Sequence, residues 1–155
     1  MLRALLILIA VLAGTAFAGA GELTLVAPDR AAIVVSPQSV ASLPGLEREV
    51  TFATSKGPST ARYDGVLVWD LLRANKLLDG LDPKAQLSKT LLVSAGDGYR
   101  IAFSIGEIHP DFGNLPLMLV TAIDGKPLEG SWRLVAPGDK RGARAVRDVA
   151  TIELR

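Results

Sequence analysis

Short runs of aliphatic and β-branched residues, each closed by a turn that contains glycine or proline, recur along almost the whole chain. Runs of this length are typical of strands, because glycine and proline interrupt a strand within a few residues. The fold class that this pattern predicts is α+β, mainly β, with short helices. The expected strands are residues 23–27, 32–35, 49–54, 60–63, 90–95, 99–104, 117–123, 132–136 and 149–154, of which the first two also fit one broken strand.

Three helical segments are expected between these strands. A helix over residues 36–43 is predicted because a serine N-cap is followed by proline at the first helical position. Apolar residues recur with helical spacing over residues 67–78, and an Asp-Gly pair follows. Ser104 and Glu107 have the spacing of a capping box, which predicts a single helical turn after the sixth strand.

The connections are expected to be loops and tight turns. Residues 55–59 are polar and contain Gly-Pro, so we expect a loop there. Asp-Gly pairs at 64–65 and 124–125, and the Gly-Asp-Gly sequence at 96–98, predict tight turns.

The first 18 residues combine one cation, Arg3, with an uninterrupted apolar run at residues 4–13 and small residues at Ala16 and Ala18. This is the pattern of a secretory signal peptide, and the apolar run is too short for a confident transmembrane helix. We expect cleavage after Ala18, or as the less favoured alternative after Ala20. Export would leave one domain of residues 19–155, with no membrane insertion after cleavage.

Charge and cysteine content exclude several function classes. Lysine and arginine number 17 and aspartate and glutamate 16, and one of the cations is Arg3 in the leader, so the mature chain is formally neutral. Neutrality argues against a nucleic-acid-binding protein that relies on overall charge. The chain contains no cysteine, which excludes disulfides, thiolate metal sites and a thiol nucleophile.

Common catalytic motifs are also missing. Residues 57–61 approach the Gly-x-Ser-x-Gly motif of serine hydrolases but lack the second glycine. Residues 96–98 lack the third glycine of a dinucleotide-binding motif and join two strands. His109 is the only histidine, so a histidine zinc site has no second ligand of that type. We expect His109 to lie in a solvent-facing loop, and we assign no catalytic residue.

Three segments that follow strand ends are candidates for a binding site. The most cationic is residues 131–148, where an apolar strand opens into a glycine-containing loop. Guanidinium groups and free backbone N–H groups in such a loop suit an anionic, polar or planar ligand, although a solvated rim of charge is the ordinary alternative. The other two are the polar segment 54–60 and the turn at Asp97 and Tyr99. The cations of the first segment are Arg133, Lys140, Arg141, Arg144 and Arg147.

An aspartate beside aromatic and guanidinium planes suits a flat heterocycle that has N–H donors. Asp97 can accept two such hydrogen bonds in a bidentate manner. Trp69 and Trp132 are candidate stacking surfaces, but Trp69 has helical spacing and is better explained by packing. Taken singly, each of these residues has an ordinary structural explanation, and only their combination favours a site.

Four motifs in order resemble the sulfite-oxidase-type molybdopterin-binding domain. Residues 59–72, STARYDGVLVWDLL, resemble its Ser-Thr-Ala-Arg-aromatic-x-Gly segment and the Asp-Leu-Leu helix that follows. Residues 96–99 resemble its Asp-Gly-Tyr turn, and residues 124–128 its Asp-Gly-x-Pro-Leu hairpin. Residues 133–147 resemble its Arg-Leu-Val-x-Pro-Gly and Gly-Ala-Arg-x-Val-Lys cofactor loop with one extra residue. The resemblance implies a sulfite-oxidase-like fold over nearly the whole mature chain.

The resemblance also implies where a ligand would lie. Arg133, Arg144 and Arg147 correspond to positions that line the cofactor loop, and the region of Thr54 and Ser55 replaces the segment that faces the metal. Enzymes of this family hold molybdenum through a cysteine thiolate just ahead of that Ser-Thr-Ala-Arg segment. This chain has none, and neither a hydroxyl nor a methyl replaces a soft anionic ligand.

By size, export and missing cysteine, the chain is similar to periplasmic pterin-binding proteins of this superfamily. Those proteins are thought to sense reduced pterins and to relay that state to a membrane-bound cyclic-di-GMP enzyme. The resemblance therefore implies a non-catalytic periplasmic protein that binds a pterin at Thr54, Ser55, Asp97, Tyr99, Trp132, Arg133, Arg144 and Arg147, without a metal. The alternatives are a molybdopterin-dependent oxidoreductase that holds its metal cofactor without the cysteine, and a ligand-free interaction module.

Overall fold

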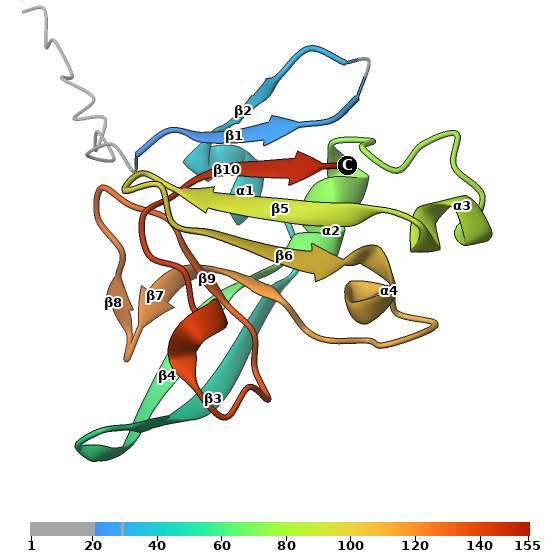
Figure 1. Cartoon of the computed structure of the whole chain (residues 1–155). Helices are drawn as coiled ribbons and strands as arrows, with labels where there is room; N and C mark the ends of the chain where they lie inside the picture. Colours follow the sequence, from blue (N-terminus) through green and yellow to red (C-terminus); the bar gives the residue numbers. More distant parts are fainter. Residues whose placement is uncertain (1–20, 29) are drawn as a thin grey trace, which may run out of the picture.

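The computed structural model describes residues 21–28 and 30–155. Its first sheet has five strands in the order β2-β1-β10-β5-β6 (Figure 1). β1 and β10 run parallel, and the other neighbours in this sheet are antiparallel. The strands are β1 (Leu23–Val26), β2 (Ile33–Val35), β5 (Thr90–Ala95), β6 (Arg100–Ser104) and β10 (Val149–Leu154).

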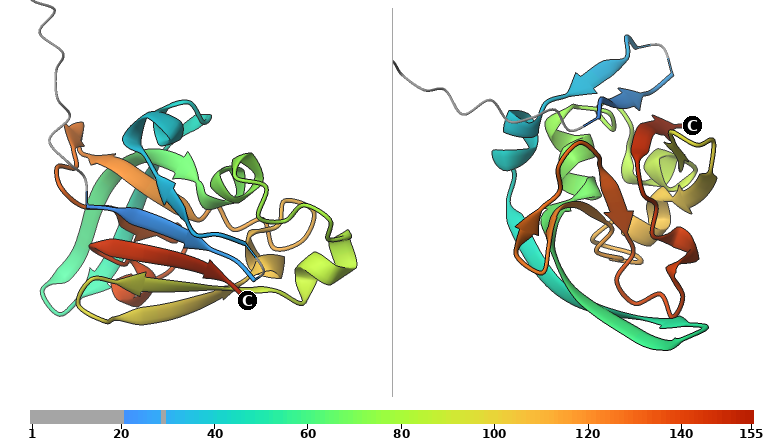
Figure 2. Two further views of the ribbon diagram at one scale, coloured as in Figure 1. Left: turned by 90° about the horizontal axis from the view of Figure 1, so that it is seen from above. Right: turned by 90° about the vertical axis from the view of Figure 1, so that its left-hand side faces the viewer.

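The second sheet is built on a long hairpin. Its strands follow the order β3-β4-β7-β8, and β9 also pairs with β7. The right-hand view of Figure 2 shows the β3–β4 hairpin curving beneath the red-orange loop that follows β9. The strands are β3 (Gly45–Thr54), β4 (Gly57–Leu67), β7 (Met118–Ile123), β8 (Lys126–Pro127) and β9 (Arg133–Val135).

The helices are short, and three of the four α-helices of the described residues begin with a side-chain N-cap. The predicted capping box is confirmed, with the Ser104 hydroxyl accepting from the Glu107 N–H at 3.1 Å and the Glu107 carboxylate accepting from the Ser104 N–H at 2.9 Å. Ser36 caps the first helix as predicted. The helices are α1 (Pro37–Ala41), α2 (Val68–Ala74), α3 (Pro83–Leu87), α4 (Ile105–Ile108) and the 3-10 turn η1 (Gly142–Arg144).

Two apolar clusters hold these elements together. The main core takes side chains from both sheets, from α2 and from α4, so the two sheets share one interior. A smaller cluster lies on the opposite face of the second sheet from the main core and includes Val50, Tyr63, Val120 and Val135. The predicted α+β, mainly β class is confirmed.

Two of the predicted connections are wrong. The loop expected at residues 55–59 is a two-residue turn, because β4 begins at Gly57 and Thr54 pairs with Gly57 across the hairpin. The turn expected at Asp64-Gly65 is instead a bulge inside β4. Glycine is needed at position 65 because a Cβ there would overlap the carbonyl oxygen of Leu119 on β7.

The helix expected over residues 67–78 is also shorter than predicted. α2 ends at Ala74, and Lys76 adopts a positive φ of 57°. Leu77 and Leu78 remain buried although they follow the helix, so the apolar spacing continues through the turn. α3 was not predicted, although Asp82 followed by Pro83 carries the same cap signal as α1.

Within the described residues, no helix combines the length and the hydropathy that a bilayer-spanning segment requires. The leader expected at residues 1–18 lies outside the described residues.

Candidate ligand-binding site

The loop of residues 136–148, which follows β9, is held from two sides. On one side the Ala53 N–H of β3 donates to the Lys140 carbonyl at 2.8 Å. On the other side the Tyr99 hydroxyl donates to the Ala143 carbonyl at 2.7 Å. The structure therefore brings the β3–β4 hairpin, the β5–β6 turn and this loop together, as the grouping of the three candidate segments predicts.

Arg144 braces the loop from within. Its guanidinium makes two hydrogen bonds to the Asp139 carboxylate, at 2.9 Å and 2.7 Å, and a third to Glu107 at 2.9 Å. The group also lies over the Phe103 ring, 4.8 Å from the ring centroid. The hydrogen bonds that Arg144 donates to Asp139, and secondarily to Glu107, raise the pKa of Arg144. Its donors are thus already engaged by the protein.

Arg133 is in the opposite situation. It lies half-buried on β9 and pairs with Val120 in the sheet register, so it shares the face of the second sheet that carries the smaller cluster. Burial lowers the pKa of Arg133, and the neighbouring Arg147 lowers it further, while Tyr63 and Asp148 oppose this. Within residues 21–28 and 30–155 neither Arg133 nor Arg147 forms an ion pair. Two adjacent cations without a paired carboxylate favour an electron-rich or anionic ligand.

Aromatic residues border this cation pair. Tyr63 is a member of the smaller cluster, and Phe52 packs against that cluster. A Cβ on Gly142 would come within 3.7 Å of the Phe52 ring, so the loop passes directly over it. Sequence reasoning did not select Tyr63, although strand alternation places it on the face opposite Arg62 within the STARY motif.

Thr54 and Ser55 lie at the end of the hairpin and mainly serve its turn. The Thr54 hydroxyl donates to the Gly57 carbonyl at 2.7 Å and accepts from the Lys56 N–H at 3.2 Å. Ser55 is exposed. Both residues follow Ala53, the contact point with the loop.

Asp97 and Tyr99 form the exposed β5–β6 turn. One carboxylate oxygen of Asp97 accepts the Tyr99 N–H at 2.9 Å, which leaves the other oxygen without a hydrogen bond within the described chain. Tyr99 is 46% exposed, and only its hydroxyl is committed to the loop. Asp97 therefore retains an acceptor, as its predicted role requires.

Trp132 does not line a surface. Its side chain is 5% exposed and belongs to the main core, so its ring is not available for stacking on a ligand. Among the described residues its buried indole N–H has no hydrogen-bond partner. The apolar strand start that suggested a stacking residue is instead a core position.

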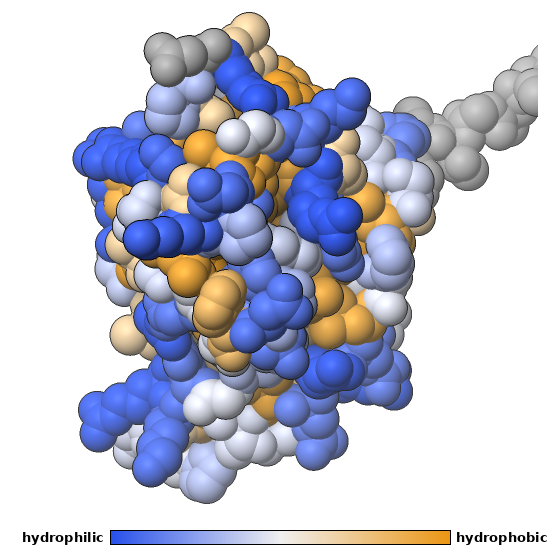
Figure 3. Space-filling model, turned by 90° about the vertical axis from the view of Figure 1, so that its right-hand side faces the viewer, coloured by the Kyte–Doolittle hydropathy of each residue, from blue (hydrophilic) through white to orange (hydrophobic). Residues whose placement is uncertain are grey.

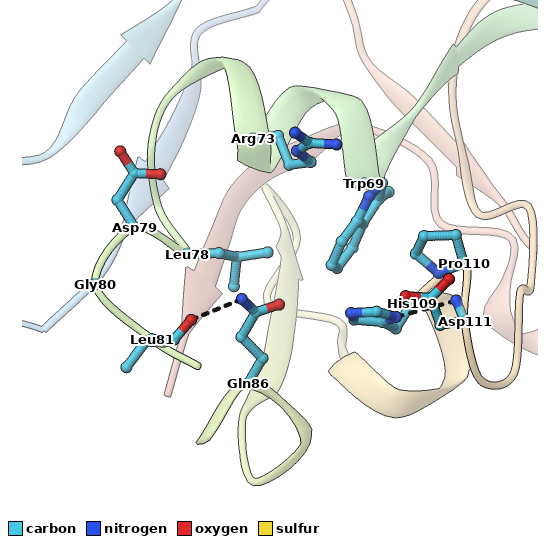
Figure 4. A pocket seen from close by; sticks show the side chains of 10 residues that line it. All are labelled: Trp69, Arg73, Leu78, Asp79, Gly80, Leu81, Gln86, His109, Pro110 and Asp111. Atoms are coloured by element: carbon cyan, nitrogen blue, oxygen red, sulfur yellow. Dashed lines mark hydrogen bonds between the residues drawn. The ribbon is translucent and has the colours of Figure 1, made fainter. Parts of the chain in front are cut away.

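The expectation of a solvent-facing His109 is wrong. Only 6% of its surface is exposed, and its ring meets Trp69 edge-on at 4.7 Å and Phe112 at 4.9 Å between centroids. The residue follows α4 and lines a pocket of about 430 Å³ (Figure 4). A histidine before proline after one helical turn gives no sequence periodicity from which this burial could be recognised.

The comparisons with known proteins are consistent with this architecture. No family model matches the chain, and no curated protein matches it. A solved structure, the sulfane dehydrogenase SoxCD from Paracoccus pantotrophus, matches with a TM-score of 0.65 and 18% sequence identity. The match covers 86% of this chain but only 38% of that one. This chain has the sulfite-oxidase-like fold. At this identity the likeness shows the fold alone.

The sulfite-oxidase-like fold raises the question of a molybdenum cofactor. The chain offers no thiolate, and the described residues contain no group of three or more side chains arranged as metal ligands. At the end of β3, where the metal-facing segment is expected, the Ala53 backbone is occupied by the loop. The donor set therefore does not fit a thiolate-held molybdenum.

Proposed function

We propose that this protein binds a pterin beside Arg133 and Arg147 and has no catalytic activity of its own. The observation that carries the proposal is the half-buried Arg133 guanidinium, which has a second cation beside it and no paired carboxylate in the described chain. A guanidinium fork donates parallel hydrogen bonds to carbonyl and ring-nitrogen acceptors. A pterin presents such acceptors along one edge.

The surroundings of Arg133 support a planar ligand. Tyr63 lies close enough to influence the Arg133 charge, and Phe52 extends the aromatic surface toward the loop. Flat rings pack favourably against such side chains. Asp97 lies in the turn that the Tyr99 hydroxyl connects to the same loop. Its carboxylate is proposed to accept hydrogen bonds from the pterin amino group.

The non-catalytic assignment rests on the donor set. Without a thiolate, the residues at the end of β3 offer only hydroxyl and backbone groups, which are poor ligands for molybdenum. A molybdopterin-dependent oxidoreductase is the alternative, supported by the dehydrogenase that shares the fold. Stoichiometric molybdenum in protein purified from its native compartment would establish that alternative.

The cellular role proposed here is that of a periplasmic sensor or carrier. The support for it is the leader at residues 1–18 and the resemblance to pterin-binding proteins that relay the pterin state to a membrane-bound cyclic-di-GMP enzyme. Co-purification of the periplasmic domain of such an enzyme, dependent on added pterin, would support the relay. Its absence would leave a carrier.

Calorimetric titration of the mature protein with a tetrahydropterin and with the oxidised pterin tests the binding. Saturable binding is expected, and a ligand concentration of a hundred times Kd stabilises the fold by about 2.7 kcal/mol. Arg133→Ala should abolish the response. Arg62→Ala is the matched control, because Arg62 pairs with Glu47 on the other face of the same sheet. A folded protein that binds neither pterin would contradict the proposal.

A further inference from the structure

A separate pocket lies between α2, the turn that follows it, α3 and the end of α4. Its volume of about 430 Å³ is within the range of small-molecule sites. None of the residues assigned to the pterin site lines it. Figure 4 shows its lining: Trp69, Arg73, Leu78, Asp79, Gly80, Leu81, Gln86, His109, Pro110 and Asp111.

His109 directs a hydrogen-bond donor into this pocket. Its Nδ1 accepts the Asp111 N–H at 3.1 Å, so Nδ1 carries no proton and the ring proton resides on Nε2. Nε2 has no hydrogen-bond partner within the described chain, although the side chain is only 6% exposed. Figure 4 shows this nitrogen on the side of the ring that faces Gln86. This nitrogen is not among the buried unpartnered polar atoms of the described residues, so it reaches the water of the pocket and is available to a ligand acceptor.

Gln86 supplies the complementary acceptor. Its amide nitrogen donates to the Leu81 carbonyl at 2.9 Å, and this bond fixes the orientation of the amide. The side-chain oxygen is left free, and Figure 4 shows it turned toward His109 across the pocket. The pocket thus presents one donor and one acceptor that face each other without being bonded to each other.

The rest of the lining favours a flat and uncharged ligand. Trp69 contributes an aromatic wall, and the leucines of the α2–α3 turn contribute apolar contacts. Arg73 carries one sign of charge, and Asp79 and Asp111 carry the other, so no polyanion is favoured. Figure 3 shows the α3 side of the molecule, where apolar surface is divided into small areas among polar groups, as suits a small ligand better than a hydrophobic protein interface.

We propose that this pocket binds a small planar cyclic amide. The carbonyl of such a ring accepts from His109 Nε2, its adjacent N–H donates to Gln86 Oε1, and its face lies against Trp69. Matching both groups at once gives specificity, because a ring that lacks either one displaces water from a protein group without replacing its hydrogen bond. This site is independent of the proposed pterin function.

Uracil is the minimal probe of this chemistry, and 1,3-dimethyluracil is its matched control, with a similar ring face but no N–H. The chain has one histidine and two tryptophans, so its imidazole and indole NMR signals are few enough to assign. Uracil should shift the His109 and Trp69 signals saturably. Dimethyluracil should bind at least about tenfold more weakly, which corresponds to roughly 1.4 kcal/mol. Equal responses to the two rings, or none to uracil, would overturn the proposal.

A pair of glutamine substitutions tests the acceptor. Gln86→Met keeps the side-chain length but removes Oε1 together with the amide nitrogen that donates to Leu81. It should weaken uracil binding about tenfold. Gln38→Met is the control, because Gln38 is exposed in α1, another five-residue helix that begins with proline. Unchanged affinity in Gln86→Met, or an equal loss in both variants, would overturn the assignment. The His109 and Trp69 NMR signals arise around α2 and the end of α4. A negative result with uracil would therefore not contradict the pterin proposal.

Discussion

Arg133 and Arg144 belong to the same strand-and-loop segment, but the pKa values of their guanidinium groups shift in opposite directions. Arg144 is held by two carboxylates, and its pKa is raised, so the fold stabilises its charge. Arg133 has a lowered pKa through burial and through Arg147, so the fold disfavours its charge. Arg144 therefore stabilises the loop, whereas Arg133 keeps its donors free within the described chain. In the sequence both belong to the same cationic segment, residues 131–148.

Arg144→Ala should destabilise the protein by about 1–2 kcal/mol, because it removes charged hydrogen bonds and leaves Asp139 and Glu107 without their partner. Arg133→Met should cause no loss, since it removes a disfavoured charge. Urea unfolding measures both. Arg155→Ala is a control, because its solvent-exposed pair with Glu153 should contribute little to stability. A larger loss for Arg133→Met than for Arg144→Ala would contradict this division.

How much of the site could be predicted depends on whether a residue's role is local. The turn at Asp97 and the capping box at Ser104 are set by neighbours in sequence, and both could be predicted. The role of Arg144 depends on Glu107, which lies in a distant helix, so no spacing in the loop reveals it. The burial of His109 and Trp132 likewise depends on tertiary packing.

Among the elements, the β5–β6 turn and η1 are joined by one side chain. Tyr99 projects from the turn and donates its hydroxyl to Ala143, while its ring stays partly exposed. This contact holds the loop against the first sheet together with the Arg144 guanidinium, which lies over Phe103 of β6. The β3–β4 hairpin was predicted only in part, because the Gly-Pro pair at residues 57–58 indicates a loop, whereas these residues pair with Thr54 and Ala53 across the turn.

Tyr99→Phe should remove this connection and cost about 1 kcal/mol. Hydrogen exchange at residues 142–145 should become faster while the strands stay protected, because only the loop is released. Tyr63→Phe is the matched control, since the Tyr63 hydroxyl makes no hydrogen bond within the described residues, and its effect should be small. Equal exchange in the two variants would show that the hydroxyl does not hold the loop.

For the whole molecule, the shared core determines whether a destabilising core substitution affects one sheet or both. Leu119 of β7 and Leu25 of β1 belong to one cluster, although they lie in different sheets. Helix α2 contributes Leu71 and Leu72 to the same cluster, so neither sheet has a large interior of its own. The loop of residues 136–148 contacts β3 of the second sheet and Tyr99 of the β5–β6 turn, which links its stability to that of both sheets.

Leu119→Ala should therefore destabilise both sheets together, by about 2–5 kcal/mol, because Leu119 is fully buried and its truncation leaves a cavity. Hydrogen exchange should accelerate by a similar factor in β4 and β10, and the circular dichroism and tryptophan fluorescence transitions should coincide. Leu46→Ala, at the edge of the smaller cluster, should cost less. If exchange in β10 stayed at its original rate while β4 opened, the two sheets would be separate cooperative units, and a ligand at Arg133 would stabilise only the second.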